Sequence, residues 1–260
     1  MDLSAFPTAG ALARGGSAPR WRPGLPCAWH SELFADSREA AGAALALALA
    51  LDGLSGPGSR QDSGQPGASD AADRRQVLWV QDAAAIRLSG RPYRPGLPES
   101  LRRRLIHVRA ARPEDALFAL EEGVRCRELA WIIGEIAGNP RALDFTASRR
   151  LSLAAEKHGV PLFLVRLDAR RDLSSARMRW QVAAAPSPPL RWNPAAPGTP
   201  SWHAELFRTR MHAPGEWILR DDGQALSAEP WAEPWAERRA GPPDHGDLAG
   251  AAGDRSLAAS

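Results

Sequence analysis

The sequence predicts an α/β domain, with a mostly parallel sheet flanked by helices, antiparallel C-terminal strands and disordered tails. Three observations lead to this prediction. Short apolar runs alternate with segments of helical periodicity through the middle of the chain, as in a parallel sheet. The last third carries strand-like runs joined by Pro/Gly loops, which favour antiparallel pairing. Both ends are rich in Gly, Pro and Ala without any period, so they are not expected to enter a core.

The elements follow one another closely along the chain. A strand at 29–34 leads into a turn at 35–38 and then into a long apolar helix. Pro113 suits the first turn of a later helix, and Thr146 is expected to cap another, which Gly159 ends. The remaining expected elements are strands at 76–82, 105–110, 130–136 and 161–167, helices at 113–126 and 146–158, and antiparallel strands at 179–185, 201–210 and 216–222.

Composition divides the chain into a core and polar extensions. We expect a flexible lead-in at 1–23, a core at 24–223 with a flexible linker at 54–72 inserted, and a disordered tail at 224–260. The charge is uneven, because the stretch from Asp221 onward holds eight acids against three arginines, whereas the whole chain carries +3. The remainder is therefore clearly basic, which suits nucleic acid or an acidic partner without identifying either.

Several function classes receive no support from the sequence. Cys27 and Cys126 are far apart, which argues for a reducing compartment and against a disulfide framework or zinc ribbon. The histidines form no HExxH pair and there is no nucleophile elbow, so we expect no metal, no cofactor and no catalytic residue. The longest apolar run, at 40–51, is too short to span a membrane. A cytoplasmic protein without a membrane partner is therefore expected.

The segment 24–51 has the order of a phosphate-binding loop, namely a strand, a tight turn and a helix. A working loop also needs glycines in the turn, a lysine on the phosphates and a Ser or Thr hydroxyl on Mg²⁺. Here alanines stand at the glycine and lysine positions, a glycine stands at the hydroxyl position, and the one arginine on the turn is unsuitably placed. The residues concerned are Ala35, Arg38, Ala40, Ala41 and Gly42. We therefore expect no nucleotide to bind.

Over this segment and its sequel, roughly 24–223, the chain resembles the core of RecA-type proteins. Those proteins carry a catalytic Glu after the second strand, where this chain has Ala83 behind Asp82. Their Walker B strand ends in an Asp, where the run AWIIGEI offers Glu135, which could ligate a metal but has no phosphate to serve. Their next strand ends in a Gln that senses the γ-phosphate, where Arg166 stands. The resemblance implies a RecA-like fold that has abandoned nucleotide chemistry.

Among RecA relatives, the chain is most similar to the ImuA family of bacterial inducible mutagenesis proteins. The runs that carry the similarity are VLWVQD, RPEDALFALEEGVRC, LDFTASRRLSLAAEKHGVPLFLVR, RWQVAAAPS and ELFRTRMHAPGEWIL. This resemblance implies a part in the SOS response to DNA damage. It also implies two partners with which such proteins copy past lesions: an inactive ImuB-like Y-family polymerase homologue and an error-prone replicative polymerase subunit. RecA itself is a further partner to be considered.

Exposed arginines and tryptophans are open to more than one interpretation. Arginines near the expected carboxyl edge of the sheet could contact single-stranded DNA or simply be solvated, and solvation is the simpler explanation. They are Arg149, Arg150, Arg166, Arg170, Arg171, Arg177, Arg179, Arg208 and Arg210. The two intervals that hold the DNA-binding loops of RecA are short here, at 137–145 and 168–176, which argues against filament-type binding. Trp21, Trp29 and Trp192 are candidates for a partner surface.

The repeat EPWAEPWAERR places Trp231 and Trp235 in the acidic tail, either as a docking motif or as a duplication in a drifting segment. Taken together, the residues and the resemblance predict a non-catalytic adaptor of translesion synthesis. Two alternatives remain open. One is a weak ATPase that regulates RecA through an unconventional phosphate site with Arg38 and Glu135, and the other is a cell-division inhibitor similar to SulA.

Overall fold

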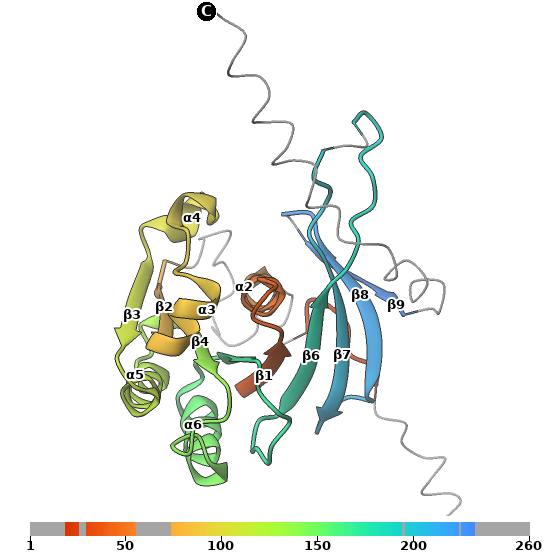
Figure 1. Ribbon diagram of the computed structural model, residues 1–260. Helices are drawn as coiled ribbons and strands as arrows, with labels where there is room; N and C mark the ends of the chain where they lie inside the picture. The colour runs from red at the N-terminus through yellow and green to blue at the C-terminus, as the bar shows by residue number, and fades with distance from the viewer. Residues whose placement is uncertain (1–18, 26–29, 56–73, 194–195, 224, 232–260) are drawn as a thin grey trace, which may run out of the picture. The chain divides into compact units, whose positions relative to one another are not determined.

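The computed structural model describes residues 19–25, 30–55, 74–193, 196–223 and 225–231 (Figure 1). The chain divides into two units, 1–230 and 231–260, and every described helix and strand lies in the first. The strands are β1 (His30–Ala35), β2 (Gln76–Asp82), β3 (Leu105–Ala110), β4 (Leu129–Ala137), β5 (Leu162–Leu167), β6 (Met178–Ala184), β7 (Ser201–Thr209), β8 (Gly215–Asp221) and β9 (Leu226–Pro230). The helices are α2 (Ala41–Ser55), α3 (Ala83–Ser89), α4 (Glu99–Arg102), α5 (Pro113–Arg125) and α6 (Phe145–His158), with a 3-10 turn η3 (Arg94–Gly96).

These strands form one sheet in the order β3-β2-β4-β5-β1-β6-β7-β8-β9. All pairs from β3 to β6 in this order are parallel, and β7, β8 and β9 continue the sheet in antiparallel fashion. The predicted α/β class, with a mostly parallel sheet and an antiparallel C-terminal extension, is confirmed. Among the described residues, no helix combines the length and the apolar character that a membrane crossing requires.

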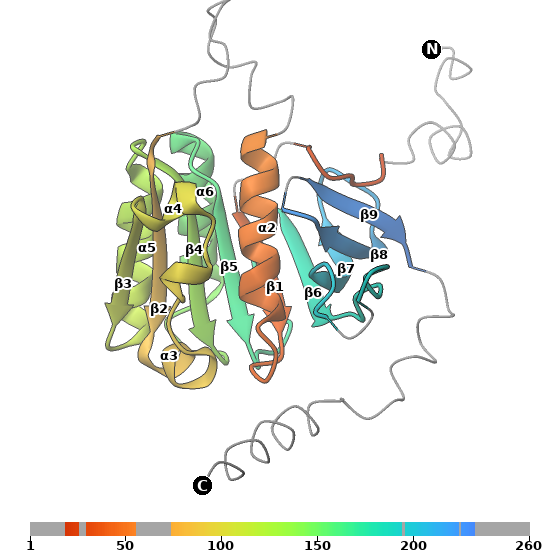
Figure 2. The same cartoon turned by 90° about the horizontal axis from the view of Figure 1, so that it is seen from above.

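Helices cover both faces of the parallel part of the sheet (Figure 2). α2, α3 and α4 lie on one face, where Leu45 and Leu49 of α2 join a core cluster with Leu33 of β1. α5 and α6 lie on the other face, where Leu120 and Leu151 belong to a second cluster. Because both faces of the inner strands are covered, β4 and β5 are almost continuously apolar.

The antiparallel extension buries one face around three tryptophans. Trp21 is 4% exposed, and its ring lies 4.9 Å from that of Trp180 and 5.7 Å from that of Trp217, edge-on to both. Arg20 forms a bridge with Ala213 beside it. The expectations that residues 1–23 are a free lead-in and that Trp21 is available to a partner are therefore wrong for Arg20 and Trp21. Trp21 packs against Trp180 of β6 and Trp217 of β8 and thereby shields their rings from solvent.

The core also extends further towards the C-terminus than predicted. β9 pairs with β8 in antiparallel register, so the sheet continues to Pro230, beyond the predicted boundary at residue 223. The sequence LSAEP is too polar to be recognised as a strand, and it is held by backbone pairing at the end of the sheet. At the other internal boundary, α2 continues to Ser55, two residues into the predicted linker, and residues 56–72 lie outside the described part of the chain.

The predicted ends of α6 are half correct. Asp144, instead of Thr146, caps the helix, because its Oδ1 accepts the N–H of Ala147 at 2.7 Å. Gly159 ends the helix in the left-handed conformation, with φ of 72°, as predicted. Asp144 precedes Thr146 by two residues, and both residue types cap helices well, so composition alone did not separate them.

Candidate functional site

The turn at the predicted phosphate-binding position joins β1 to α2 at the carboxyl edge of the parallel strands (Figure 2). Ala35 is the last residue of β1 and Ala41 is the first residue of α2, with Ala40 immediately before the helix. Gly42 lies in the first turn of α2, where a Cβ atom would come within 2.8 Å of side-chain atoms of both Ala35 and Val165. The glycine is therefore required by the close approach of the helix to the sheet.

Backbone N–H groups of this turn already have acceptors in the protein. The N–H of Ser37 donates to Oδ1 of Asp168 at 2.8 Å. The N–H of Arg38 donates to Oδ1 of Asp36 at 2.9 Å, and the N–H of Glu39 donates to the carbonyl oxygen of Asp36 at 3.2 Å. In a phosphate-binding loop such groups point at the ligand instead. Three consecutive donors are thus engaged by the protein's own oxygens.

Carboxylates surround the turn. Hydrogen bonding to Arg38 lowers the pKa of Asp36 to about 2, so this carboxyl group is charged at neutral pH. Oε2 of Glu39 accepts the N–H of Ala184 at 2.6 Å. Asp168 has a positive φ of 51°, and its own N–H donates to the carbonyl oxygen of Ala35, which fixes its side chain against the turn. A phosphate placed here would meet negative charge where a working loop supplies a lysine.

Glu135, which the resemblance to RecA-type proteins predicts at the Walker B position, is buried in β4 and bonded by neutral donors. Its Oε1 accepts from Nε1 of Trp79 at 2.6 Å and from Nε2 of Gln81 at 3.0 Å. Its Oε2 accepts from the hydroxyl of Ser89 at 2.9 Å. Burial raises the pKa of Glu135. The carboxyl group is thus satisfied by the protein, and no group of three or more metal-ligating side chains occurs in the described parts of the chain.

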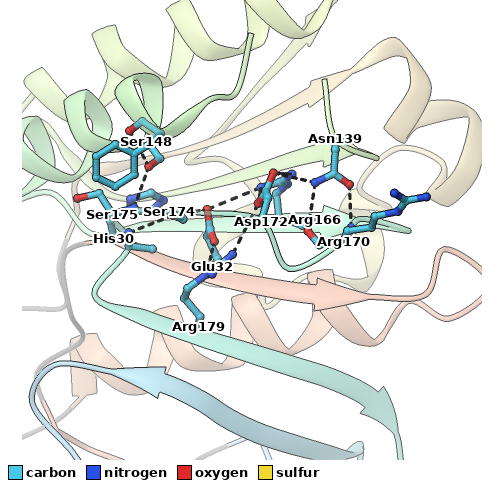
Figure 3. A network of polar contacts seen from close by, with 12 residues as sticks. His30, Glu32, Asn139, Ser148, Arg166, Arg170, Asp172, Ser174, Ser175 and Arg179 are labelled. Atoms are coloured by element: carbon cyan, nitrogen blue, oxygen red, sulfur yellow. Dashed lines mark hydrogen bonds and ion pairs between the residues drawn. The ribbon is translucent and has the colours of Figure 1, made fainter. Parts of the chain in front are cut away.

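A buried ion-pair network connects the three central strands β5, β1 and β6 (Figure 3). Glu32 of β1 is fully buried, and its Oε2 accepts from Nε of Arg179 of β6 at 2.7 Å. Nη1 of Arg166 of β5 lies 3.8 Å from Oε1 of Glu32, which also accepts the hydroxyl of Ser174 at 2.8 Å. The guanidinium groups of Arg166 and Arg179 both lie over the ring of Phe34, at 5.6 and 5.0 Å.

The same network holds parts of the two intervals, 137–145 and 168–176, at which the resemblance to RecA-type proteins predicted DNA-binding loops (Figure 3). Oδ2 of Asp172 lies 3.4 Å from Nη2 of Arg166 and accepts from Nδ2 of Asn139 at 2.7 Å. Asn139 also accepts the N–H of Arg170 through Oδ1 and donates to the carbonyl oxygen of Arg170. Residue 139 follows β4 and residues 170–172 follow β5, so the two segments are bonded to one another. This arrangement favours a fixed surface over mobile DNA-binding loops.

A second set of polar contacts lies at the start of β1 (Figure 3). The buried ring of His30 lies with Nδ1 2.7 Å from the hydroxyl of Ser152. The hydroxyl of Ser148, one turn earlier in α6, accepts the N–H of Ser175 at 2.8 Å. Burial lowers the pKa of His30 to about 4, so the ring is neutral at neutral pH. These contacts fix the irregular segment between β5 and β6 against the sheet.

Burial corrects part of the predicted arginine surface. Arg166 and Arg179 are 1% and 3% exposed and are neutralised by Glu32 and Asp172. They cannot reach DNA phosphates without breaking the core, so these two assignments are wrong. Arg166 lies on β5 and Arg179 on β6, the two strands that flank β1 inside the sheet, and the sequence did not reveal that their side chains are buried.

The other seven predicted arginines lie nearer the surface. Three have carboxylate partners, namely Arg150 with Glu121, Arg171 with Glu205 and Arg177 with Glu156. The side chains of Arg149, Arg170, Arg208 and Arg210 are exposed. A contact between these residues and DNA stays a prediction.

The proposed tryptophan surface is only partly described. Trp192 is 79% exposed on the loop between β6 and β7, in agreement with a free side chain. Trp231 directly follows β9, whereas Trp29 and Trp235 lie outside the described residues.

Two features of the structure escaped the sequence interpretation. Glu32 lies inside β1, where every residue is buried, and a charged residue within a buried strand is a signal of a buried pair, but its partners are more than 130 residues away. The second feature is the arginine-rich segment 91–112, which holds seven arginines and one acid, Glu99. This signal was visible in the sequence, and the structure places it at the β3 edge of the sheet.

Comparison with known proteins supports one resemblance. No family model matches the chain. Protein ImuA from two strains of Caulobacter vibrioides is 34% identical to the chain over 161 residues. The match covers 55% of this chain and 59% of the relatives, so the chain spans less than two thirds of their length. Over the matched region the chain is similar to Protein ImuA, which confirms the resemblance drawn from its sequence.

Proposed function

We propose that this chain is a non-enzymatic, RecA-like accessory protein of SOS-induced, error-prone translesion DNA synthesis in the cytoplasm. The observation that carries the proposal is the 34% identity to Protein ImuA over 161 residues. The motifs that resemble the ImuA family lie on β2, α5, α6 with β5, β6 and the β7–β8 hairpin, and hence in both the parallel and the antiparallel part of the sheet. The similarity therefore does not rest on a single motif.

A non-enzymatic role is supported by the turn between β1 and α2. Its N–H groups at residues 37–39 are bonded within the protein, three carboxylates surround it, and Ala41 stands where a lysine would be needed. Binding of Mg-ATP would require these bonds to break and the negative charges to be neutralised. These costs favour a role as a docking scaffold over one as an ATPase.

The resemblance to ImuA suggests an ImuB-like Y-family polymerase homologue and an error-prone replicative polymerase subunit as partners. RecA is a further proposed partner, because residues 24–223 resemble the core of RecA-type proteins in sequence. The buried ion pairs of Glu32 and the bonded loops at 139 and 170–172 support a rigid scaffold of this kind. A rigid surface suits an adaptor because little conformational entropy is lost when partners bind.

The test is co-purification of this protein with the ImuB-like protein of its own organism. The full chain is compared with a form that ends at Trp231, because an earlier end would remove β9 from the sheet. Co-elution of the full chain is expected. Its loss in the shortened form would place the contact in the tail that holds Trp235, and retention would place it on the core. Absence of co-elution of both forms would contradict the adaptor role.

Nucleotide binding is tested separately by thermal denaturation at millimolar Mg-ATP. No increase in melting temperature is expected, because a ligand stabilises a protein only when it binds the folded state. A saturable increase that is lost in Arg38→Ala or Glu135→Gln would favour the weak ATPase instead.

A further inference from the structure

The segment 91–112 concentrates positive charge at one edge of the sheet. It contains seven arginines and one acidic residue, Glu99. The segment runs through η3 and α4 into β3, which is the terminal strand of the sheet order and lies at its outer edge in both views (Figures 1 and 2). Every arginine predicted above to contact DNA lies elsewhere, between α6 and the turn that follows β7.

Two of the arginines shape this edge. Nη2 of Arg94 donates to the carbonyl oxygen of Leu105 at 3.0 Å, and Nε of Arg102 donates to the carbonyl oxygen of Leu97 at 2.9 Å. These bonds hold the irregular stretch before β3 against the first residue of the strand. Nε of Arg104 donates to the carbonyl oxygen of Arg75 at 2.7 Å, and Arg112 pairs with Asp115. These four arginines have partners within the protein, which leaves Arg91, Arg103 and Arg109 to be accounted for.

Arg91, Arg103 and Arg109 are exposed, and the described part of the chain offers their side chains no hydrogen-bond acceptor or carboxylate. This distinguishes them from Arg150, Arg171 and Arg177, which have acidic partners. Arginines without a counter-charge are free to neutralise an external anion.

The contacts of Gln81 and His107 place Arg91 and Arg109 near one another. His107 and Arg109 lie two residues apart on β3 and hence on the same face, and Arg109 is in register with Gln81. Nε2 of His107 lies 2.9 Å from Oε1 of Gln81, whose Nε2 donates to the carbonyl oxygen of Gly90, the residue before Arg91. Burial lowers the pKa of His107, and the charges of Arg91, Arg109 and Arg94 lower it further.

An exposed aromatic ring accompanies the charges. Tyr93 is 74% exposed between Arg91 and Arg94, and its ring carbon lies 3.1 Å from where a Cβ atom on Gly96 would stand. The ring therefore rests over the backbone of η3 with most of its surface free. Arginines that follow a backbone, together with an exposed aromatic ring on which a base can stack, are the two components of single-strand binding surfaces.

We propose that the β3 edge is a binding surface for single-stranded nucleic acid, with Arg91, Arg103 and Arg109 on the phosphates and Tyr93 under a base. An acidic peptide would also be attracted by the arginines, but it would give the exposed ring no specific role. The inference goes beyond the adaptor role, and it is tested with this chain and nucleic acid alone, so either can fail without the other.

The experiment measures fluorescence anisotropy of a labelled oligo-dT of about 15 nucleotides at several salt concentrations. The test variant is R91E/R103E/R109E. The matched control is R22E/R127E/R191E, which makes the same change in net charge at exposed arginines before β1, between α5 and β4, and on the loop between β6 and β7. Circular dichroism and melting temperature establish that both variants are folded.

The test variant is expected to lose about a hundred-fold in affinity at 0.1 M salt, and its slope of log affinity against log salt should fall by about 2, at about 0.7 per lost phosphate contact. The control should retain most of the affinity. Tyr93→Ala should lose about ten-fold while Tyr93→Phe retains binding, because stacking needs only the ring.

Three results would overturn the proposal. They are no binding by the unmodified protein at low salt, equal losses in the two triple variants, and no effect of Tyr93→Ala. Tighter binding of labelled poly-glutamate than of oligo-dT, with the same dependence on the three arginines, would overturn it too and indicate an acidic protein partner.

Discussion

Replacement of Glu32 by Gln should unfold this protein at a much lower denaturant concentration. The buried network holds two positive groups, Arg166 and Arg179, and two negative groups, Glu32 and Asp172. Glu32→Gln keeps the size and shape of the side chain but leaves two guanidinium groups against the single carboxylate of Asp172, which is 35% exposed. The charge balance of the core is then lost.

The expected cost follows from the burial of the pair. Glu32 is fully buried and Arg179 is 3% exposed, with 2.7 Å between Oε2 and Nε, so water cannot replace the lost contact. Removal of one partner from a buried pair costs about 3–5 kcal/mol of unfolding free energy. We expect about 3 kcal/mol, the lower end, because Asp172 remains close to both arginines.

Urea denaturation followed by circular dichroism measures this cost. With a slope of about 2 kcal/mol per M, the midpoint should fall by about 1 to 2 M. The control is Glu205→Gln, which breaks the more exposed pair with Arg171 and should cost at most about 1 kcal/mol.

A second substitution tests the charge-balance argument itself. Arg179→Met added to Glu32→Gln leaves one cation, Arg166, against one anion, Asp172, so the double variant should be more stable than Glu32→Gln alone. A double variant that is no more stable, or a Glu32→Gln midpoint equal to that of the unmodified protein, would refute the reasoning.

Two further predictions concern His30 and Trp21. The pKa of His30 is about 4 in the folded chain and about 6.5 in the unfolded chain. The contribution of His30 to the free energy of unfolding is therefore fully present above pH 6.5, and about 3 kcal/mol is lost as the pH falls towards 4. Because the pKa of Glu135 is raised, its contribution makes the protein less stable as the pH rises, which is the opposite direction. Urea denaturation of the unmodified protein and of His30→Asn across this pH range isolates the contribution of the histidine as the difference between the two profiles. Parallel pH profiles would contradict the assignment. Trp21→Ala should cost about 3–5 kcal/mol in the same assay, whereas Trp192→Ala, at an exposed site, should stay within about 0.5 kcal/mol; equal losses would place Trp21 outside the core.

The residue pattern was sufficient for the fold class and for most elements. Runs such as QVLWVQD and PLFLVRL are apolar because strands covered on both faces must be, and this property is readable without any partner strand. The absence of a lysine at Ala41 was equally readable, since a phosphate-binding loop needs particular residue types at a fixed spacing. The resemblance to ImuA rests on the same kind of local information.

Pairing over long distances was decided by the tertiary structure alone. β9 is too polar to be recognised as a strand, yet backbone pairing with β8 makes it one, and Trp21 is buried only because β6 and β8 place two other tryptophans beside it. Arg166 and Arg179 looked like surface arginines for the same reason. Their counter-charge, Glu32, is more than 130 residues away in sequence, and only the strand order β5-β1-β6 brings the three together. Local composition determines which residues can form strands and helices, whereas the neighbours of a charge are determined by how the chain folds back on itself.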